Sequence, residues 1–471
     1  MGQTIIEKLW DAHSIADLGN GNQLIYIDRV FFHERTGSIA LQGLEAAGRN
    51  VRNPEQVFGC MDHIVDTLPG RTDDTMVPGG SAFITTTREA AHAAGVNLFD
   101  LGDDRQGIVH VVSPEQGIAL PGLTLVCPDS HTCTQGALGT LAWGIGSTEC
   151  EHALATKTLA VKKPRFMRVG FTGRLGYGIT AKDMILHLIG RHTASGGVGY
   201  AIEFADEAVR ALPMEARFTL CNMGVEFGAW SCIIAPDQTT YDYIAGRPYA
   251  PKDHTWDQAL AYWQSLPSDD DARFDKEITI DCSTLAPQVT WGTSPQHETG
   301  IDGMVPNPAN EADINHRQSI ERALEYMGLE PGTQLAGLPI DSAFIGSCTN
   351  SRLSDLRSAA GILKGRKVAA GVKAICVPGS GQVKKAAEAE GLHRIFTEAG
   401  FEWREPGCSM CFYAGGDNLG LGKRTVSSTN RNFENRQGPG TKTHLASPTT
   451  VAASAVRGCL TDVRTLEPNH G

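Results

Sequence analysis

Two closely spaced cysteines are the first residues in this sequence whose types and spacing could do chemistry. Cys408 and Cys411 lie behind a Pro-Gly turn in the stretch EPGCSMC (405–411). Thiolates bind soft metals and iron–sulfur clusters, or form a redox-active dithiol. A structural zinc site usually adds a second Cys-x-x-Cys pair, and the sequence has none. The pair therefore indicates a redox dithiol or a metal centre completed from elsewhere, with a chance pair in a turn as the third interpretation.

A third thiol could complete such a centre. Cys348, in FIGSCTNSR (344–352), follows a predicted strand at the point where a loop begins. Sites in open α/β sheets gather at strand ends. Three thiolates would hold a 4Fe–4S cluster by three corners and leave the fourth iron open as a Lewis acid. Taken alone, Cys348 is better explained as a buried, inert cysteine.

Histidines beside carboxylates form a second group with chemical potential. Imidazole–carboxylate pairs suit proton transfer near neutral pH. The candidates are Asp62 with His63, then His110, and the run Asp129, Ser130 and His131 directly after a predicted strand. Each histidine alone could be an ordinary satisfied side chain. Three such groups in glycine-punctuated loops favour a site.

Amide and guanidinium groups supply candidate substrate ligands. Asn222 and Glu226 are four residues apart, which on a helix would put both on one face. The stretch STNRNFENRQG (428–438) carries Asn430, Arg431 and Arg436, and the planar fork of arginine suits carboxylates. A solvated helix face and a surface loop are the alternatives for these two stretches.

Short apolar strands alternating with helices are predicted to position these residues, which indicates an α/β fold. The predicted strands are 23–30, 123–128, 165–171, 342–347 and 373–378, and the predicted helices are 136–160, 180–192, 213–228, 351–363 and 381–391. Thr180 and Asp183 resemble a capping box. We expect three lobes: 1–165 with the His/Asp loops, 166–285 with Asn222 and Glu226, and 286–471 with the cysteines.

Composition excludes some classes of protein. The 471 residues carry a net charge of −12, which argues against nucleic acid as the main partner. No apolar run is long enough to span a membrane, and no signal peptide opens the sequence. We therefore expect a cytoplasmic protein with no membrane partner, whose 12 cysteines stay reduced.

Taken together, these segments resemble the aconitase family, and within it the large subunits of bacterial 3-isopropylmalate dehydratases. The resemblance runs from TIIEKLWDAH to TDVR. Its most specific stretches are GSCTNSRLSDLR, EAGFEWREPGCSMC, STNRNFENRQG, QVTWGTSP and ITAKDMI. It implies three α/β/α lobes around an iron–sulfur cluster, with a swivelling fourth domain carried by another chain.

The resemblance also implies roles for the candidates. Cys348, Cys408 and Cys411 would hold one 4Fe–4S cluster per subunit. Asp62 and His63 would protonate the departing hydroxyl, and His110 with Asp129 and His131 with Glu226 would form further catalytic pairs. The positions implied to bind substrate or support the cluster are Ser130, Asn222, Arg431 and Arg436.

The implied reaction dehydrates 2-isopropylmalate to 2-isopropylmaleate and rehydrates it to 3-isopropylmalate, a step of leucine biosynthesis. The base would be a serine of a small subunit, which would also supply arginines for the substrate. We therefore expect this chain to be active only with that subunit.

Two positions depart from the pattern of these large subunits. Pro128 stands where a glycine is usual, and Gln135 where a histidine is usual, and the stretch VDTLPGRTDD (65–74) also differs. A related hydro-lyase acting on citramalate or dimethylmalate is therefore the main alternative. A cluster-free relative that binds nucleic acid is a further one, and the acidic balance opposes it.

Overall fold

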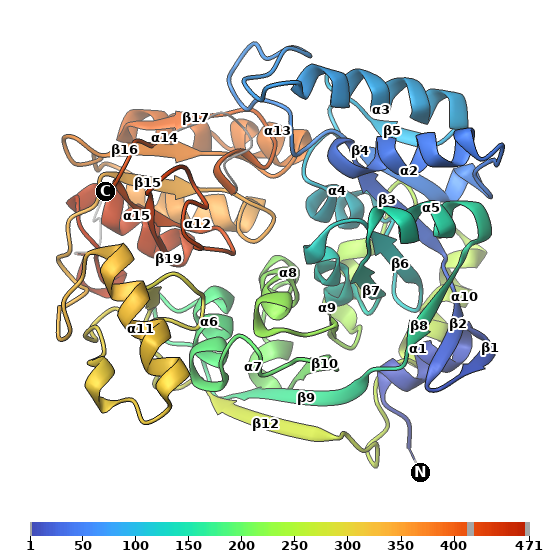
Figure 1. Ribbon diagram of the computed structural model, residues 1–471, viewed down its shortest axis with the longest axis horizontal. Helices are drawn as coiled ribbons and strands as arrows, with labels where there is room; N and C mark the ends of the chain where they lie inside the picture. The colour runs from blue at the N-terminus through green and yellow to red at the C-terminus, as the bar shows by residue number, and fades with distance from the viewer. Residues whose placement is uncertain (1, 412–418, 467–471) are drawn as a thin grey trace. The chain divides into compact units, whose positions relative to one another are not determined.

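Three parallel sheets with helices between their strands form the framework of the chain in the computed structural model, which describes residues 2–411 and 419–466 (Figure 1). The chain divides into two compact units. Unit 1 comprises residues 1–65, 72–173 and 195–281, and unit 2 comprises residues 66–71, 174–194 and 282–471. An α/β architecture was predicted, and it is confirmed.

The first sheet of unit 1 has five parallel strands. In spatial order these are β5 (Asn97–Phe99), β4 (Val57–Cys60), β3 (Arg29–His33), β6 (Thr124–Cys127) and β7 (Leu141–Gly144). Every residue of β4 and β6 is buried. Such unbroken apolar runs are typical of central parallel strands covered on both faces.

Helices surround this sheet. They are α2 (Glu34–Ala46), α3 (Gly80–Ala94), α4 (Val109–Gln116) and α5 (Ser147–Thr156). Helix α2 packs against both α3 and α5, and the three lie side by side in Figure 1. A 3₁₀ helix, Ser130–Leu138, follows β6 and packs against β7 and α4.

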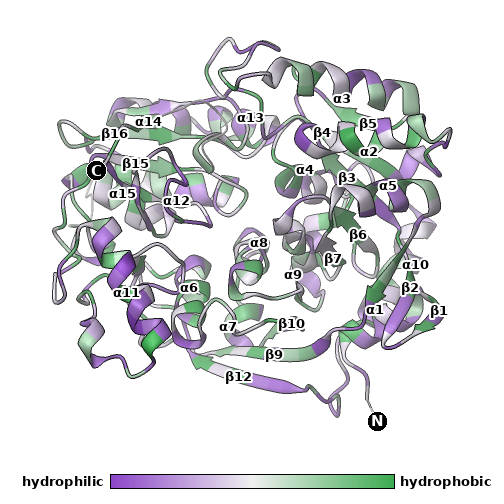
Figure 2. Ribbon diagram, in the orientation of Figure 1, coloured by the Kyte–Doolittle hydropathy of each residue, from purple (hydrophilic) through white to green (hydrophobic). Residues whose placement is uncertain are grey.

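The second sheet of unit 1 is also parallel and runs β11 (Ser231–Ile233), β10 (Tyr200–Ala205), β9 (Arg165–Thr172), β12 (Lys276–Asp281). Strand β12 alternates buried and exposed residues, as an edge strand with one wet face should, and Figure 2 colours much of it hydrophilic. The associated helices are α7 (Glu207–Arg210), α8 (Met214–Met223), a 3₁₀ turn (Gly224–Phe227), α9 (Gln238–Ile244) and α10 (His254–Gln264).

The remaining part of unit 1 is an antiparallel sheet built from the N-terminal segment. Its strands are β1 (Ser14–Gly19), β2 (Asn22–Tyr26) and β8 (Thr158–Lys162), and α1 (Ile5–His13) precedes it. Thr4 caps α1 through a reciprocal capping box with Glu7.

Unit 2 is organised on the third parallel sheet. Its strands, in spatial order, are β17 (Phe401–Trp403), β16 (Lys373–Cys376), β15 (Ser342–Ile345), β18 (Arg424–Ser427) and β19 (Lys442–Leu445). The helices of this unit are α6 (Ala181–His192), α11 (Ile314–Met327), α12 (Leu353–Leu363), α13 (Gly381–Ala389), α14 (Leu392–Ala399) and α15 (Pro448–Arg457). A hairpin of β13 (Gln288–Thr290) and β14 (Glu298–Gly300) completes it.

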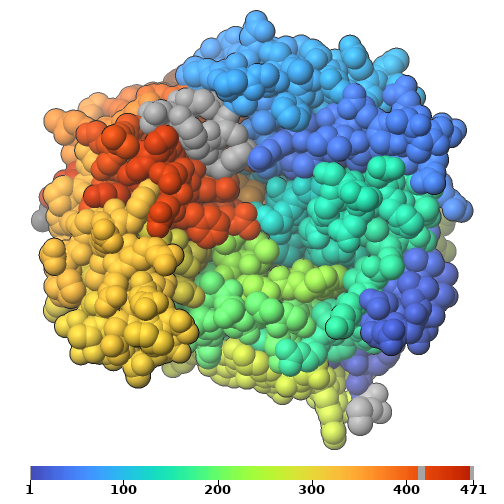
Figure 3. All heavy atoms as spheres, viewed as in Figure 1, coloured from blue at the N-terminus to red at the C-terminus, as the bar shows by residue number. Residues whose placement is uncertain are grey.

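Helix α11 belongs to the outer face of unit 2. Only one side of it is buried, through Ile320, Ala323, Leu324 and Met327, a spacing of three and four residues. The segment around it forms a broad exposed surface in Figure 3 (yellow).

Most predicted elements are confirmed, and two are wrong. The predicted helix 136–160 is instead the end of a 3₁₀ helix, strand β7, helix α5 and strand β8. The predicted strand 23–30 is divided between β2 and β3. The predicted capping residues of α6 are confirmed, since the carboxylate of Asp183 accepts the backbone N–H of Thr180 at 2.7 Å.

Among the described residues, no helix is both long and apolar enough to cross a bilayer. The chain forms two compact units. The expected division into three lobes stays a prediction.

Candidate functional site

Polar side chains gather at the carboxyl ends of the parallel strands in both units, the edge where open α/β sheets place their sites. In unit 1 these side chains are mostly imidazoles and carboxylates, and in unit 2 they are mostly thiols. Each group is described within its own unit.

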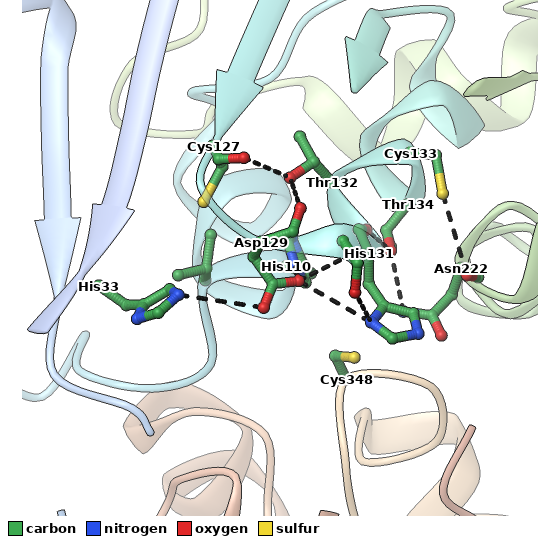
Figure 4. A network of polar contacts seen from close by, with 12 residues as sticks. His33, His110, Cys127, Asp129, His131, Thr132, Cys133, Thr134, Asn222 and Cys348 are labelled. Carbon is green, nitrogen blue, oxygen red and sulfur yellow. Dashed lines mark hydrogen bonds and ion pairs between the residues drawn. The ribbon is translucent and has the colours of Figure 1, made fainter. Parts of the chain in front are cut away.

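The carboxylate of Asp129 is the centre of the acid–base group of unit 1, which we call the Asp129 cluster (Asp129, His33, His63 and His110). Asp129 follows β6, and its carboxylate accepts the Nε2–H of His110 at 2.7 Å. The Nε2 atoms of His63 and His33 lie 3.4 Å and 4.0 Å from the other carboxylate oxygen. Figure 4 shows His33 and His110 directed at Asp129 from different elements.

Electrostatics keep this carboxylate ionised. Burial alone would raise the pKa of Asp129, but the charges and hydrogen bonds of His110 and His63 hold it well below its ordinary value. The backbone N–H of His131 also donates to Asp129, at 2.8 Å. An anion held in this way can orient imidazoles and stabilise their protonated forms.

Asp62 and His63 form an adjacent pair in the loop after β4. The side chain of Asp62 is fully buried, bonds to His63 Nδ1 and accepts the backbone N–H of Val109 at 3.1 Å. Burial would raise the pKa of Asp62, but the charge and hydrogen bond of His63 hold it below its usual value. The pair combines an ionised carboxylate with an imidazole whose Nε2 faces Asp129, which suits proton donation or acceptance.

His131 and Glu226 form the second predicted pair. His131 Nε2 donates to the carboxylate of Glu226 at 2.9 Å, and both side chains are buried. The hydroxyl of Ser130, which is exposed, lies 3.3 Å from His131 Nδ1. The predicted pairing is present in the structure.

The premise that placed Asn222 and Glu226 on one helical face is wrong. Helix α8 ends at Met223, and Glu226 lies in the following 3₁₀ turn. Both side chains nevertheless contact the 3₁₀ helix after β6, because Asn222 Nδ2 donates to Thr134 Oγ1 at 2.9 Å and Glu226 bonds His131. Tertiary contacts, rather than helix periodicity, bring them together.

Two residues of the neighbouring strand end were missed from the sequence. His33 ends β3 and stacks its ring on that of His63, with centroids 3.9 Å apart. Glu34 follows it and is fully buried. The dipeptide stands at a strand end, which is the signal that could have identified it.

In unit 2 the three predicted thiols lie in one group, which we call the cysteine site (Cys348, Cys408 and Cys411). Cys348 follows β15, and the other two follow β17 in a turn where Cys411 N–H donates to Cys408 O at 2.9 Å. Ser347 Oγ lies 3.2 Å from the sulfur of Cys411 and 3.9 Å from that of Cys348. All three cysteines are about 5% exposed.

Groups that donate hydrogen bonds contact these sulfur atoms. Asn430 Nδ2 donates to Cys348 Sγ at 3.3 Å, and Arg436 approaches Cys411 Sγ at 4.0 Å. N–H and O–H groups aimed at sulfur stabilise thiolates rather than thiols. The other predicted arginine, Arg431, lies in the same loop over the ring of Phe433.

Other cysteines lie in the core of the chain. Burial raises the pKa values of Cys127, Cys221, Cys232 and Cys376 well above the ordinary range, and that of Cys150 to about 12. Cys133 donates its thiol to Cys221 O at 3.1 Å. These are the properties of inert, protonated thiols.

The backbone at the cysteine site is held in unusual conformations. Ser347 and Ser409, which adjoin the cysteines, have φ values of 77° and 47°. Such left-handed conformations are costly for residues other than glycine and occur where surrounding contacts enforce them. One such contact is Arg352, whose buried guanidinium donates to Cys348 O at 3.0 Å.

The unusual stretch 65–74 also contributes to this site. Thr67 O accepts the N–H of Glu405 at 2.8 Å, and Thr67 Oγ1 lies 3.1 Å from Ser409 Oγ. Arg71 donates to Pro406 O at 2.5 Å. Residues 66–71 thus support the turn that carries the cysteine pair, a role that sequence reasoning did not assign.

Buried Lys182 of α6 fixes the loop after β18. Its ammonium donates to the carbonyl oxygens of Ser428, at 3.2 Å, and Thr429. These residues directly precede Asn430, so the lysine helps to hold the amide that contacts Cys348. Through Lys182, the stretch ITAKDMI therefore supports the loop that contacts the cysteine site.

A cavity of about 550 Å³ in unit 1 lies apart from the predicted residues. Two of its arginines are paired within the protein: Arg168 bonds Asp206 at 2.6 Å, and Arg217 bonds Asp237 at 2.7 Å. It does not compete with the Asp129 cluster as an acid–base site.

The sequence is similar to known proteins over nearly its whole length. The family model described as the aconitase family (aconitate hydratase) matches residues 7–458. The curated 3-isopropylmalate dehydratase large subunit 1 of Bradyrhizobium diazoefficiens is 53% identical over 466 residues, or 99% of this chain and 97% of that protein. A solved structure, aconitase X of Thermococcus kodakaraensis (holo-form), aligns with a TM-score of 0.46 and 12% identity over 91% of this chain and 88% of that one.

Proposed function

This chain belongs to the aconitase family, and we propose that it is the large subunit of a 3-isopropylmalate dehydratase that isomerises 2-isopropylmalate to 3-isopropylmalate. The observation that carries this proposal is the 53% identity to a curated large subunit, because it extends over 99% of the chain. The reaction would be a step of leucine biosynthesis in the cytoplasm. The fold would consist of three lobes.

The cysteine site fits a 4Fe–4S cluster by its donor chemistry. Three buried sulfur atoms lie in two adjoining turns, and Asn430 and Ser347 donate toward them. Cys348, Cys408 and Cys411 would hold the cluster, with Asn430 and Arg436 supporting the thiolates. When bound, the cluster supplies a Lewis acid for the substrate hydroxyl.

The residues of unit 1 would move the protons. His63, held by Asp62, would protonate the departing hydroxyl. His110 with Asp129, and His131 with Glu226, would orient the water that returns and accept the proton that it loses as its oxygen adds to carbon. Ser130, Asn222, Arg431 and Arg436 would contribute to substrate binding.

A small subunit would complete the enzyme. Abstraction of the proton beside a carboxylate needs a base, which we propose is a serine of that subunit, together with arginines for the substrate carboxylates. The printed name of the relative, a large subunit, supports a two-chain enzyme.

Iron and acid-labile sulfide per chain, measured on protein purified without oxygen, would test the cofactor first. We expect about four of each. Little or no iron after reconstitution would contradict the proposal and favour a thiol redox protein using Cys408 and Cys411, or a cluster-free binding protein.

Turnover of 2-isopropylmalate, citramalate and dimethylmalate by the chain with its small subunit would test the substrate. We expect kcat/KM for 2-isopropylmalate to exceed the others by at least about tenfold. Gln135, buried beside His110 in place of the usual histidine, is the observation that favours a different alkylmalate. Preference for citramalate or dimethylmalate would establish that alternative.

A further inference from the structure

The carboxylate of Glu34 binds the loop that carries Asp62 and His63. One of its oxygens accepts the backbone N–H of Asp62 at 2.9 Å, and the other accepts the N–H of His63 at 2.7 Å and that of Ile64. Three consecutive N–H groups that converge on one anion determine the path of the backbone between them. Glu34 thus fixes the point from which the His63 side chain leaves the loop.

The residue before it, His33, supports the His63 ring. The two imidazoles are stacked, with 3.9 Å between centroids and 20° between planes. Burial and the charge of His63 lower the pKa of His33 to about 4, so His33 is neutral near pH 7 and does not repel a protonated His63. Because His33 pairs with Cys60 in the β3–β4 register, the two strand ends are in direct contact.

Glu34 also acts on His63 through charge. Burial and the charge of Asp62 raise the pKa of Glu34 to about 7, while the charge of His63 and the backbone hydrogen bonds oppose that rise. The interaction is mutual: an anionic Glu34 favours the protonated form of His63 to the same extent that His63 favours the anion.

A metal site is the competing interpretation of these residues. One ligand atom from each of His33, Glu34, Asp62 and His63 lies within 4.8 Å of the others. The carboxylates, however, already bond to protein groups: Glu34 to three backbone N–H groups, and Asp62 to His63 and to Val109 N–H. A cation would have to displace these hydrogen bonds, so the contacts favour a support for the pair.

We propose that Glu34 is the positioning residue of the Asp62–His63 pair, fixing its loop and favouring the protonated state of His63. What the pair does rests on the proposed function, whereas how the pair is held does not. The proposal makes Glu34 act through His63 and gives it no contact with substrate.

Two substitutions distinguish the effect of the charge of Glu34 from the effect of its side-chain length. Glu34→Gln keeps the length but removes the charge, and its amide N–H₂ turns a donor toward one of the backbone donors. Glu34→Asp keeps the charge and shortens the side chain by one methylene. Asp183→Asn is the matched control, because Asp183 is also fully buried and also accepts backbone N–H groups, from Gln288 and Thr180, but lies in unit 2.

The first readout is the pH dependence of kcat for the two-subunit enzyme with its cluster. If His63 must be protonated to act, activity falls as pH rises past its pKa. For Glu34→Gln we expect this limb to move down by about one pH unit and kcat to fall at least about tenfold. For Glu34→Asp we expect the limb to stay and kcat to fall about tenfold. For Asp183→Asn we expect the alkaline fall in kcat to stay at the wild-type pH, even if the melting temperature of this variant is lower.

The second readout does not depend on turnover. The pKa of His63 is measured by NMR on the full chain with ¹³Cε1-labelled histidines, with His63→Gln to assign the signal. We expect Glu34→Gln to lower it. If the wild type fails to turn over any alkylmalate while this shift is seen, the proposed function fails and the positioning role survives.

A purely structural role would give a different result. Glu34→Gln would then lose thermal stability as Asp183→Asn does, with the pH limb and the His63 signal both where the wild type has them, and the proposal would be wrong. If Glu34→Gln does not fold, Glu34→Asp becomes the test of the proposal. A kcat equal to that of the wild type in Glu34→Asp would also overturn the proposal.

Discussion

The five-stranded sheets of the two units both end in loops of polar residues, but the two loop sets balance charge differently. At the end of β6 the carboxylate of Asp129 is surrounded by imidazoles that can carry the matching positive charge. Beyond β15 the sulfur of Cys348 meets an amide N–H, and that of Cys411 meets a hydroxyl and a guanidinium. The first set can satisfy itself with protons. The second set places hydrogen-bond donors around sulfur atoms, an arrangement that can stabilise thiolates.

This difference shows that protonation equilibria and metal loading should be separable by mutation. Changes in the Asp129 cluster should alter pH profiles and leave iron content intact. Changes in the cysteine site should remove iron and leave the titration of unit 1 histidines intact. The predictions below test that separation, beginning with the largest effect.

Replacing Cys348 with serine should lower kcat by more than about 10³-fold and remove the cluster. The reason is that a hydroxyl is a poor ligand for iron compared with a thiolate. The measurement is iron and sulfide per chain, followed by turnover. The control is Cys376→Ala in neighbouring strand β16, whose thiol is buried and has a pKa well above the ordinary range. A serine variant with full iron content would break the assignment of Cys348 as a ligand.

Replacing Asp129 with asparagine should lower kcat by about 10²–10⁴-fold without loss of iron, since the imidazoles of His110 and His63 lose their anion. The matched control is Asp28→Asn. Asp28 also holds a histidine, His13, at 2.8 Å and also accepts a backbone N–H, but lies outside the cluster. Both variants should be less stable, and only the first should lose turnover.

The pH dependence of stability gives a second check on Asp129. Its pKa is depressed in the folded chain, so its ionisation stabilises the fold above the ordinary aspartate pKa, and this contribution is lost progressively as pH falls from that value toward the lower folded one. Melting temperatures of the wild type and Asp129→Asn should therefore converge at acid pH. A constant difference between them down to about pH 3 would contradict the charge argument.

The sequence predicted that Cys348, Cys408 and Cys411 belong together because its signals were local and chemically specific. A Cys-x-x-Cys pair has few explanations, and Cys348 stood at a strand end. The same reasoning selected His63, His110, Asp129 and His131, because three imidazole–carboxylate groups in glycine-rich loops together favour a site. Strands β6, β15 and β16 followed from short, mostly apolar runs.

What the sequence could not show depends on contacts between distant segments. The position of Glu34 at a strand end could mark it as a candidate, but its bonds to the loop 62–64 depend on the pairing of β3 with β4. The helix predicted at 136–160 failed because apolar residues of β7 and α5 merged into one helical pattern across a turn. The roles of Thr67 and Arg71 at the cysteine turn depend on a contact across more than 300 residues of sequence.

A histidine in the core of unit 2 should contribute a separate acid sensitivity. His444 is fully buried, with Nδ1 donating to Thr290 O at 2.6 Å and Nε2 accepting from Arg424 at 2.8 Å. Burial and the charge of Arg424 lower its pKa to about 3. Because the unfolded chain takes up this proton near pH 6.5 and the fold does not, stability should fall by about 1.4 kcal/mol per pH unit below that value.

His444→Gln should flatten this dependence, since an amide can donate to Thr290 and accept from Arg424 without titrating. Denaturant midpoints between pH 4 and 7 provide the measurement. His316→Gln is the control, because His316 is half-exposed and bonds only at the surface with Glu311. If the stability of His444→Gln still falls with pH as steeply as that of the wild type, while its iron content is unchanged, another group causes the acid sensitivity. The assignment of that sensitivity to the core of unit 2 would then be wrong.

The smallest effect is expected at Gln135, which tests how far the Asp129 cluster extends. Its Nε2 lies 3.4 Å from His110 Nδ1, a long contact, and its Oε1 is buried with no hydrogen-bond partner among the described residues. Removing a buried group that is already poorly satisfied costs little, so Gln135→Met should change stability by less than about 1 kcal/mol. Its effect on kcat should be below about threefold, because Asp129 rather than Gln135 determines the orientation of His110 through the short bond to Nε2. A tenfold loss of kcat with an altered pH profile would instead place Gln135 within the cluster, and the amide would then be the feature that adapts this chain to its own alkylmalate.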